Sequence, residues 1–96
     1  MLIDKGIAEG EIVSLKLSSG EEIITKLVEE TSVGYKVSKP LVLSMNQQGL
    51  GMIPFMFTND MEKDLVINKG SVIVITPCEQ QFANQYIQGT TGIKLA

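Results

Sequence analysis

Hydrophobic and polar residues alternate along this chain in short runs that turn residues separate. In EIVSLKL (residues 11–17), Val13, Leu15 and Leu17 alternate with polar residues, and SSG (residues 18–20) follows. A period of two places successive side chains on opposite faces of an extended backbone. The run therefore predicts a half-buried strand that ends in a turn.

The next run, EEIITKLVEET (residues 21–31), is compatible with two structures. Its apolar residues lie at helical spacing, and Ser19 with Glu22 would form a capping box. Its β-branched residues, and Gly20 between two apolar runs, are instead typical of a hairpin. The local pattern leaves both structures open.

Four further runs have the composition of strands: YKVSKPLVLSM (35–45), LGMIPFMF (50–57), LVI (65–67) and VIVI (72–75). Turn residues at 32–34 and 46–49 and a charged segment at 58–64 separate these runs. Proline donates no backbone hydrogen bond, so Pro40 demands an edge, a bulge or a bend within the first run.

Asn68-Lys69-Gly70 interrupts what would otherwise be one long strand. The segment is either a plain hairpin turn or a turn that faces a ligand. The VIVI run that follows is apolar on both faces, so its second face needs cover. Another subunit or a C-terminal helix would provide that cover, and the pattern does not choose between them.

One helix is expected near the C-terminus. Thr76 as N-cap, Pro77 in the first helical position and Glu79 in the third form a capping box. The pattern predicts a helix over about residues 77–88 and a tail over residues 89–96. Several short strands with tight turns and one helix indicate a mainly β domain of the small barrel or sandwich type.

Composition narrows the class of protein. The 96 residues are 44% hydrophobic and describe one globular domain, residues 1–96. No run is apolar enough to span a membrane, residues 1–10 lack the basic segment and long apolar core of a signal peptide, and the single cysteine suits a reducing compartment. We therefore expect a cytoplasmic protein. The net charge of −3, with eight lysines and no arginine, argues against a reader of duplex DNA sequence.

Candidate catalytic and metal-binding residues are few. The chain has no histidine, the commonest general base and metal ligand. Asp60, Glu62 and Asp64 have the every-second-residue spacing with which a calcium-binding loop begins. Such a loop needs Gly at its sixth position and Glu at its twelfth, and these positions are Leu65 and Ser71 here. We therefore expect no enzyme activity, no metal and no cofactor.

INKGSVIVI (residues 67–75) resembles the second sequence motif of Sm and LSm proteins, in which a basic residue and a glycine lead into the last strand. The matching residues are Ile67, Lys69, Gly70, Val72 and Ile75. VSLKLSSGEEIITKL (residues 13–27) is similar to the first motif. Together with the helix segment EQQFANQYI, the chain looks most like phage-encoded Sm-like proteins from marine viral sequence. The resemblance covers about residues 11–77.

Three positions depart from the family pattern. Thr25 replaces the glycine of the second strand, Thr31 the usual aspartate, and Tyr35 the base-contacting asparagine. The helix of the family is normally N-terminal, whereas the helix expected here is C-terminal.

The resemblance implies a five-stranded, strongly bent antiparallel sheet, a small open barrel, with a C-terminal helix. It makes residues 21–31 a bent strand. Sm-like proteins pair their edge strands into closed rings, so we expect a cyclic homo-oligomer of about five to seven subunits. A ring would cover the second face of the VIVI run and would repeat each pore lysine once per subunit.

The resemblance also implies a site for single-stranded RNA or DNA. Tyr35 would stack on bases, Asn68 and Lys69 would contact base edge and phosphate, and Gly70 would allow close approach. Thr31 and Lys36 complete the expected site. Cross-strand packing for Tyr35, a plain turn for Lys69-Gly70 and a solvated face for Lys36 are the simpler alternatives.

The resemblance therefore predicts a ring-forming protein that binds single-stranded nucleic acid and takes part in RNA or DNA processing. The alternative is a structural or protein-interaction ring that binds no nucleic acid. The acidic net charge and the replaced family residues favour this alternative.

Overall fold

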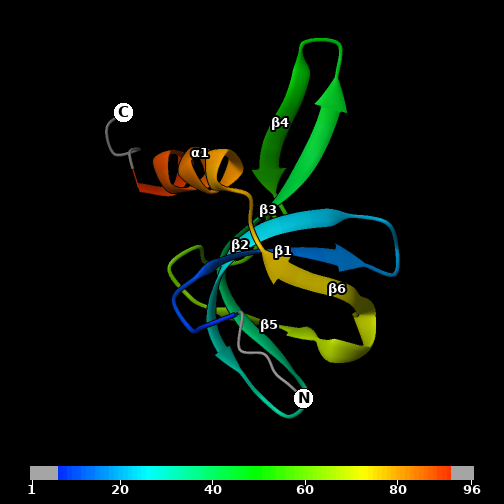
Figure 1. Cartoon of the computed structure of the whole chain (residues 1–96), viewed down its shortest axis with the longest axis vertical. Coiled ribbons are helices and arrows are strands. Elements are labelled where there is room, and N and C mark those ends of the chain that lie inside the picture. The colour runs from blue at the N-terminus through cyan, green and yellow to red at the C-terminus, as the bar shows by residue number, and fades with distance from the viewer. Residues whose placement is uncertain (1–6, 92–96) are drawn as a thin grey trace.

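Six strands and one helix make up the computed structural model, which describes residues 7–91 (Figure 1). They are β1 (Ile12–Leu17), β2 (Glu22–Glu30), β3 (Gly34–Asn46), β4 (Gly49–Pro54), β5 (Leu65–Asn68), β6 (Val72–Pro77) and α1 (Gln80–Thr91). A short 3-10 turn, η1 (Lys69–Ser71), joins β5 to β6. All strand pairs are antiparallel, as in the sheet that the resemblance implied.

The strands form one sheet in the order β4-β3-β2-β1-β6, and β5 pairs with the same edge of β3 as β4 does. β4 pairs with Leu41–Asn46 and β5 with Gly34–Val37. The expected five strands are thus six, because the strand opposite β3 is interrupted. Pro54 ends β4, and β5 begins only at Leu65, after the charged segment.

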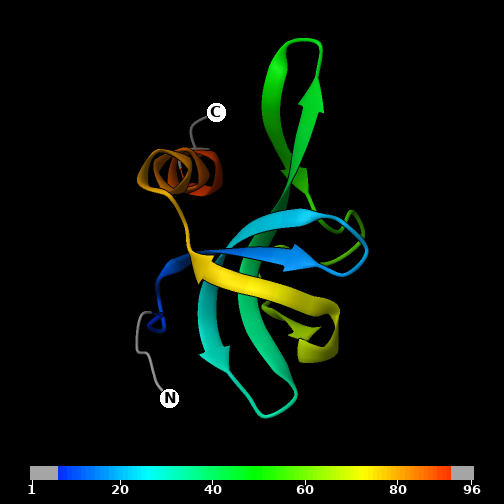
Figure 2. The same ribbon diagram turned by 45° about the vertical axis from the view of Figure 1, so that its right-hand side comes forward.

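The sheet curls around its core without closing (Figure 2). Within residues 7–91, β6 forms one edge, β4 and β5 form the other, and the two edges do not pair with each other. The mainly β, strongly curved antiparallel architecture agrees with the expected open sheet. Both edges therefore present unpaired backbone N–H and C=O groups, a surface on which another strand could pair.

A bulge bends β3 beside β2, as the proline predicted. Ile24 pairs with Leu41 and the next pair is Lys26 with Ser38, so one residue of β2 faces two of β3. These two are Lys39, which has a positive φ of 49°, and Pro40. The extra residue increases the local twist and turns the end of β3 out of the body of the sheet.

Beyond that bulge, β3 and β4 form a hairpin that projects from the body, which we call the arm (Figures 1 and 2). Gly49, with φ 117°, occupies its turn, where a left-handed backbone favours glycine. Apolar side chains on the arm remain exposed, and Met45 is 74% exposed.

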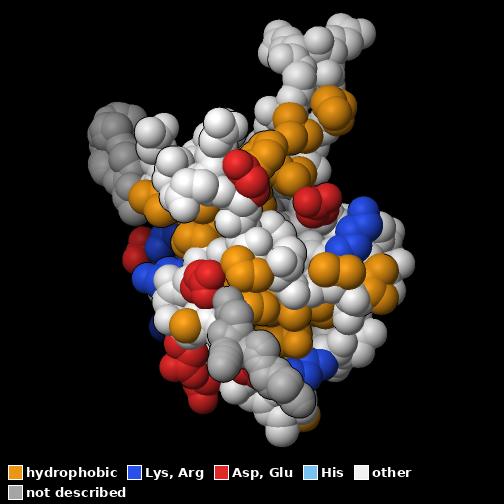
Figure 3. Space-filling model, in the orientation of Figure 1, with side chains coloured by type: hydrophobic (Ala, Val, Ile, Leu, Met, Phe, Trp, Pro, Cys, Tyr) orange, Lys and Arg blue, Asp and Glu red, His pale blue; other side chains and the backbone are white. Residues whose placement is uncertain are grey.

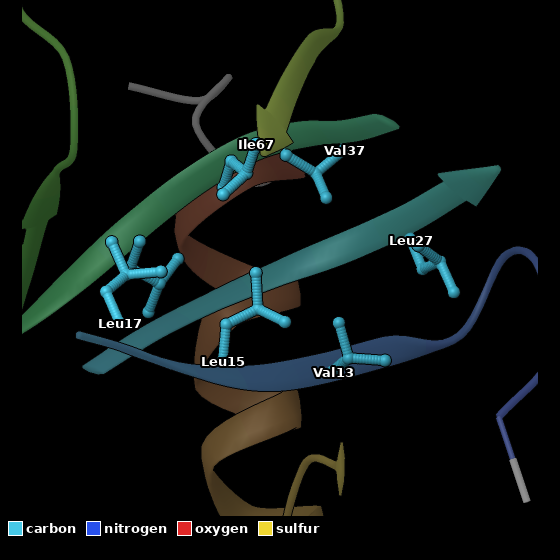
Figure 4. Packing of buried hydrophobic residues seen from close by; sticks show 7 residues of the cluster. Val13, Leu15, Leu17, Leu27, Val37 and Ile67 are labelled. Atoms are coloured by element: carbon cyan, nitrogen blue, oxygen red, sulfur yellow. The ribbon is translucent and has the colours of Figure 1, made fainter. Parts of the chain in front are cut away.

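The core lies on the concave face of the sheet (Figure 4). It consists of buried residues from β1, β2 and β3 and one more from β5: Val13, Leu15, Leu17, Ile23, Leu27, Val37 and Ile67. The alternating residues of β1 are therefore its buried face, as expected. Residues 21–31 are a strand and not a helix, because β2 pairs with β1 on one side and with β3 on the other.

The helix begins three residues later than the sequence predicted. Thr76 and Pro77 continue β6, since they pair with Ser14 and Val13 of β1. The side chain of Glu79 provides the N-cap, accepting hydrogen bonds from the backbone N–H groups of Gln81 (2.9 Å) and Phe82 (3.3 Å). A carboxylate at this end also favours the helix through its dipole. No helix within residues 7–91 is long and apolar enough to cross a bilayer.

The helix does not cover the second face of β6. Its buried residues, Ala83 and Tyr86, pack elsewhere, whereas Ile73 is 66% exposed and Val74 is 50% exposed. The sequence left open whether another subunit or a C-terminal helix covers this face. The helix α1 does not cover Ile73 and Val74.

Tyr86 holds the helix against the bend of the sheet. Its phenol donates a hydrogen bond to the carbonyl oxygen of Ser38 at 2.7 Å, and the hydroxyl of Thr25 donates to the same oxygen at 2.7 Å. Tyr86 is almost fully buried, and this burial raises the pKa of its phenol.

Changing Tyr86 to Phe removes the hydrogen bond of the phenol. Near neutral pH this loss is expected to lower the free energy of unfolding by about 1 kcal/mol. Above pH ~10 the unfolded wild type releases the phenolic proton more readily than the folded protein does, so wild-type stability falls. The difference between the two proteins should therefore shrink at high pH. Urea unfolding at pH 7 and at about pH 10.5 measures it. A difference that stays constant would contradict the role given to the phenol.

Candidate nucleic-acid interface

Two turns meet at one end of the sheet. The β2–β3 turn spans residues 31–34, and η1 lies beside it because β5 pairs with the start of β3. The backbone N–H of Lys69 donates to the carbonyl oxygen of Val33 at 2.9 Å, and Gly34 pairs with Asn68. The β2–β3 turn and the Asn68-Lys69-Gly70 segment are therefore neighbours in space.

Gly34 allows this close approach. A Cβ at that position would lie 2.6 Å from the carbonyl oxygen of Ile67 and 2.6 Å from Cγ1 of Val66. Only glycine fits there without moving the strand. Sequence analysis gave this residue no role beyond a turn, because its contacts come from a strand more than thirty residues later.

Lys69 lies between an acid and an aromatic ring. Its Nζ is 2.8 Å from Oε2 of Glu30 and 5.5 Å from the centroid of the Tyr35 ring. Glu30 and Tyr35 are a directly opposed pair of β2 and β3, so both side chains share one face of the sheet. Glu30 is the site residue that sequence analysis missed, and only the strand register identifies it.

Of the two roles that the sequence left open for Tyr35, the structure shows cross-strand packing. It is partly buried and packs against the core, opposite Ile67 in the register. Its ring also carries Lys69 at cation–π distance. The ring is thus a packed side chain with one part directed to the site.

Asn68 and Gly70 shape the turn. The side-chain Oδ1 of Asn68 accepts a hydrogen bond from the N–H of Gly70 at 2.7 Å, which caps η1. The carboxamide NH2 of Asn68 is then the group that can donate to a ligand. The turn is not that of a hairpin, because β5 pairs with β3 and β6 pairs with β1.

Thr31 has a structural task. Its hydroxyl accepts from the N–H groups of Val33 (3.3 Å) and Gly34 (3.0 Å) and donates to the carbonyl oxygen of Gly34 (3.1 Å). These bonds close the β2–β3 turn. Thr31 therefore lies at the site and supports it, with its hydroxyl already occupied.

Lys36 is the one expected site residue that the structure does not bring to the others. Side chains alternate along a strand, so Lys36 lies on the face opposite to that of Tyr35. Its register partners are Glu29 and Val66, and Val66 is exposed. The expectation that Lys36 belongs to the site is not supported by this placement.

A groove lies elsewhere, between the arm, the β1–β2 turn and the start of α1. Its volume is about 790 Å³, and its walls include Ile24, Leu43, Leu50 and Phe82 as well as polar side chains. Figure 3 shows hydrophobic side chains that extend along the lower part of the arm and onto the body of the domain.

Within residues 7–91, no three Cys, Asp or Glu side chains are grouped so that they could hold a metal ion. No model of a known protein family matches this chain, and no curated protein matches it.

Proposed function

We propose that this protein is a ring-forming, Sm-like protein without enzymatic activity that binds single-stranded nucleic acid, with RNA the first candidate. Its role would be in RNA or DNA processing in the cytoplasm, of a host cell if a phage encodes it. The observation that carries the proposal is the junction of the two turns, which sets Lys69 beside the ring of Tyr35.

This junction offers what a single strand needs. Aromatic rings stack bases with little preference for sequence, and a lysine attracts phosphate. The capped turn presents the NH2 group of Asn68 next to both. Three kinds of contact, to base face, base edge and backbone, thus come from residues within one small area.

The edges of the sheet support the ring. β6 and β5 are both unpaired on their outer sides within the described residues, and Val66, Ile73 and Val74 are exposed along them. Pairing of β6 with β5 of a neighbour would satisfy both edges and would bury these side chains. Such a head-to-tail contact uses two different surfaces, so it generates a ring when its rotation closes.

A ring also removes the difficulty of the net charge. Each chain carries a charge of −3, which alone would repel a nucleic acid. Repeated about an axis, one Lys69 per chain becomes a circle of cations around the pore. Local potential, and not the total charge, then governs binding.

Tyr35→Ala is expected to weaken binding of short oligo-uridine, oligo-cytidine and oligo-adenosine to similar extents. The expected loss is about 1–3 kcal/mol for each stacked base. Tyr35→Phe retains the ring and should bind like the wild type. Fluorescence anisotropy with labelled strands measures the affinities, and circular dichroism checks that both variants fold. Loss confined to one base type would contradict stacking as the mode of binding.

The second candidate function is a ring that serves as a structural or protein-interaction module. It is favoured by the exposed apolar side chains of the arm and by Glu30, which neutralises Lys69. Salt separates the two functions. Phosphate contacts weaken steeply as salt rises, whereas an apolar protein contact barely changes.

A further inference from the structure

The charge of Lys69 is already balanced before any ligand arrives. Its Nζ contacts the Glu30 carboxylate at 2.8 Å and lies over the Tyr35 ring at 5.5 Å. The two groups proposed to meet a nucleotide, the ammonium and the ring, are therefore engaged with each other and with an acid. A base that stacks on this side of the ring must displace the ammonium.

The ion pair contributes little to the stability of the fold. The side chain of Lys69 is 35% exposed and that of Glu30 is 57% exposed, so solvent screens their attraction. Pairs of this kind stabilise a folded protein by about 0–1 kcal/mol. At the site itself, however, the Glu30 carboxylate occupies the ammonium group that a phosphate would have to contact.

We infer that Glu30 acts as a latch on the site: its carboxylate holds Lys69 over Tyr35 and competes with the incoming phosphate for the ammonium. This inference rests on the proposed function and adds to it the residue that sets the affinity. Binding exchanges one anion for another at Lys69, which keeps affinity low for strands that make few contacts. Long strands, which engage several subunits, compensate for opening each latch.

The latch is tested with Glu30→Gln, which keeps the shape of the side chain and removes its charge. Glu29→Gln is the matched control, because it removes the same charge from the adjacent residue. Glu29 is paired with Lys36 in the register, on the face opposite to Lys69. The probe is a labelled oligo-uridine strand, titrated with wild type and both variants at several salt concentrations.

At low salt, Glu30→Gln is expected to bind about fivefold more tightly than the wild type, and Glu29→Gln like the wild type. The dependence of log K on log salt should also steepen for Glu30→Gln, by up to ~0.7 for each phosphate newly held by a lysine. In the wild type, salt weakens the latch and the phosphate contact together, so the slope is shallower. A purely structural role of Glu30 would not change this slope.

Other outcomes overturn the latch in distinguishable ways. If the wild type binds and Glu30→Gln binds equally or more weakly, Glu30 positions Lys69 and does not compete with phosphate. If both variants gain affinity equally, the effect is one of overall charge. If none of the three proteins binds at any salt concentration, the proposed nucleic-acid function itself is contradicted, and the latch with it.

Discussion

Changing Lys69 to Glu is expected to lower the affinity for single-stranded oligonucleotides by about a hundredfold or more, because like charges placed close together cost several kcal/mol. The variant removes the Lys69 ammonium from the junction of the two turns and places a second carboxylate beside Glu30. In a ring, the same change occurs in every subunit. The ring itself should persist, since the side chain of Lys69 is not part of a sheet edge.

The matched control is Lys36→Glu, which makes the same change of charge one residue beyond Tyr35. Because Lys36 lies on the opposite face of β3, this variant should retain most of its affinity. Anisotropy titrations of both variants at low salt give the comparison. Equal losses would show that overall charge governs binding, and an unchanged Lys69→Glu would remove this residue from the site.

Changing Ile73 to Lys is expected to convert the ring into monomers. Ile73 is 66% exposed in the single chain, so the variant should fold with almost unchanged stability. In the ring, the introduced ammonium would lie in the contact with the neighbouring β5 edge, where an unpaired buried charge costs several kcal/mol. Size-exclusion chromatography with light scattering measures the resulting mass.

Met45→Lys is the control for this variant. Met45 is 74% exposed, but it lies on the arm and not on β6. It should leave the assembly intact. If only Met45→Lys dissociates, the interface includes the arm. If Ile73→Lys still forms a ring, assembly through the β6 edge is contradicted.

Local pattern was sufficient to predict the strands that have one buried face. Alternation in residues 11–17 identified β1 and its buried side chains, and Pro40 indicated an edge, a bulge or a bend, of which β3 has a bulge. These features depend on a few adjacent residues. Residues 21–31 were ambiguous because β-branched residues at helical spacing satisfy both patterns. This segment is a strand because it pairs with β1 on one side and with β3 on the other, and the local sequence does not show that pairing.

The helix start shows where local rules compete. Thr76, Pro77 and Glu79 satisfied a capping box, but backbone pairing with β1 keeps Thr76 and Pro77 in β6. Glu79 is the N-cap instead, and its carboxylate accepts hydrogen bonds from backbone N–H groups of the first turn. A sheet register formed by distant residues overrode a valid local signal.

The site was predictable only in part for the same reason. The Lys69-Gly70 turn is visible in the sequence, but its acidic partner Glu30 becomes apparent only when the register opposes it to Tyr35. Lys36 is adjacent to Tyr35 in the sequence, but the two side chains lie on opposite faces of the sheet because side chains alternate along a strand. Gly34 is required by a strand that approaches from residues 65–68, so no pattern around it shows that need.

Native mass spectrometry of the purified protein, with and without a short oligo-uridine strand, tests the central claim most directly. We expect one closed species of about five to seven subunits that takes up a single strand. A ring of that size that takes up no strand would leave the assembly in place and contradict nucleic-acid binding. A monomer at micromolar concentration would contradict the ring, and with it the site that the ring is proposed to complete.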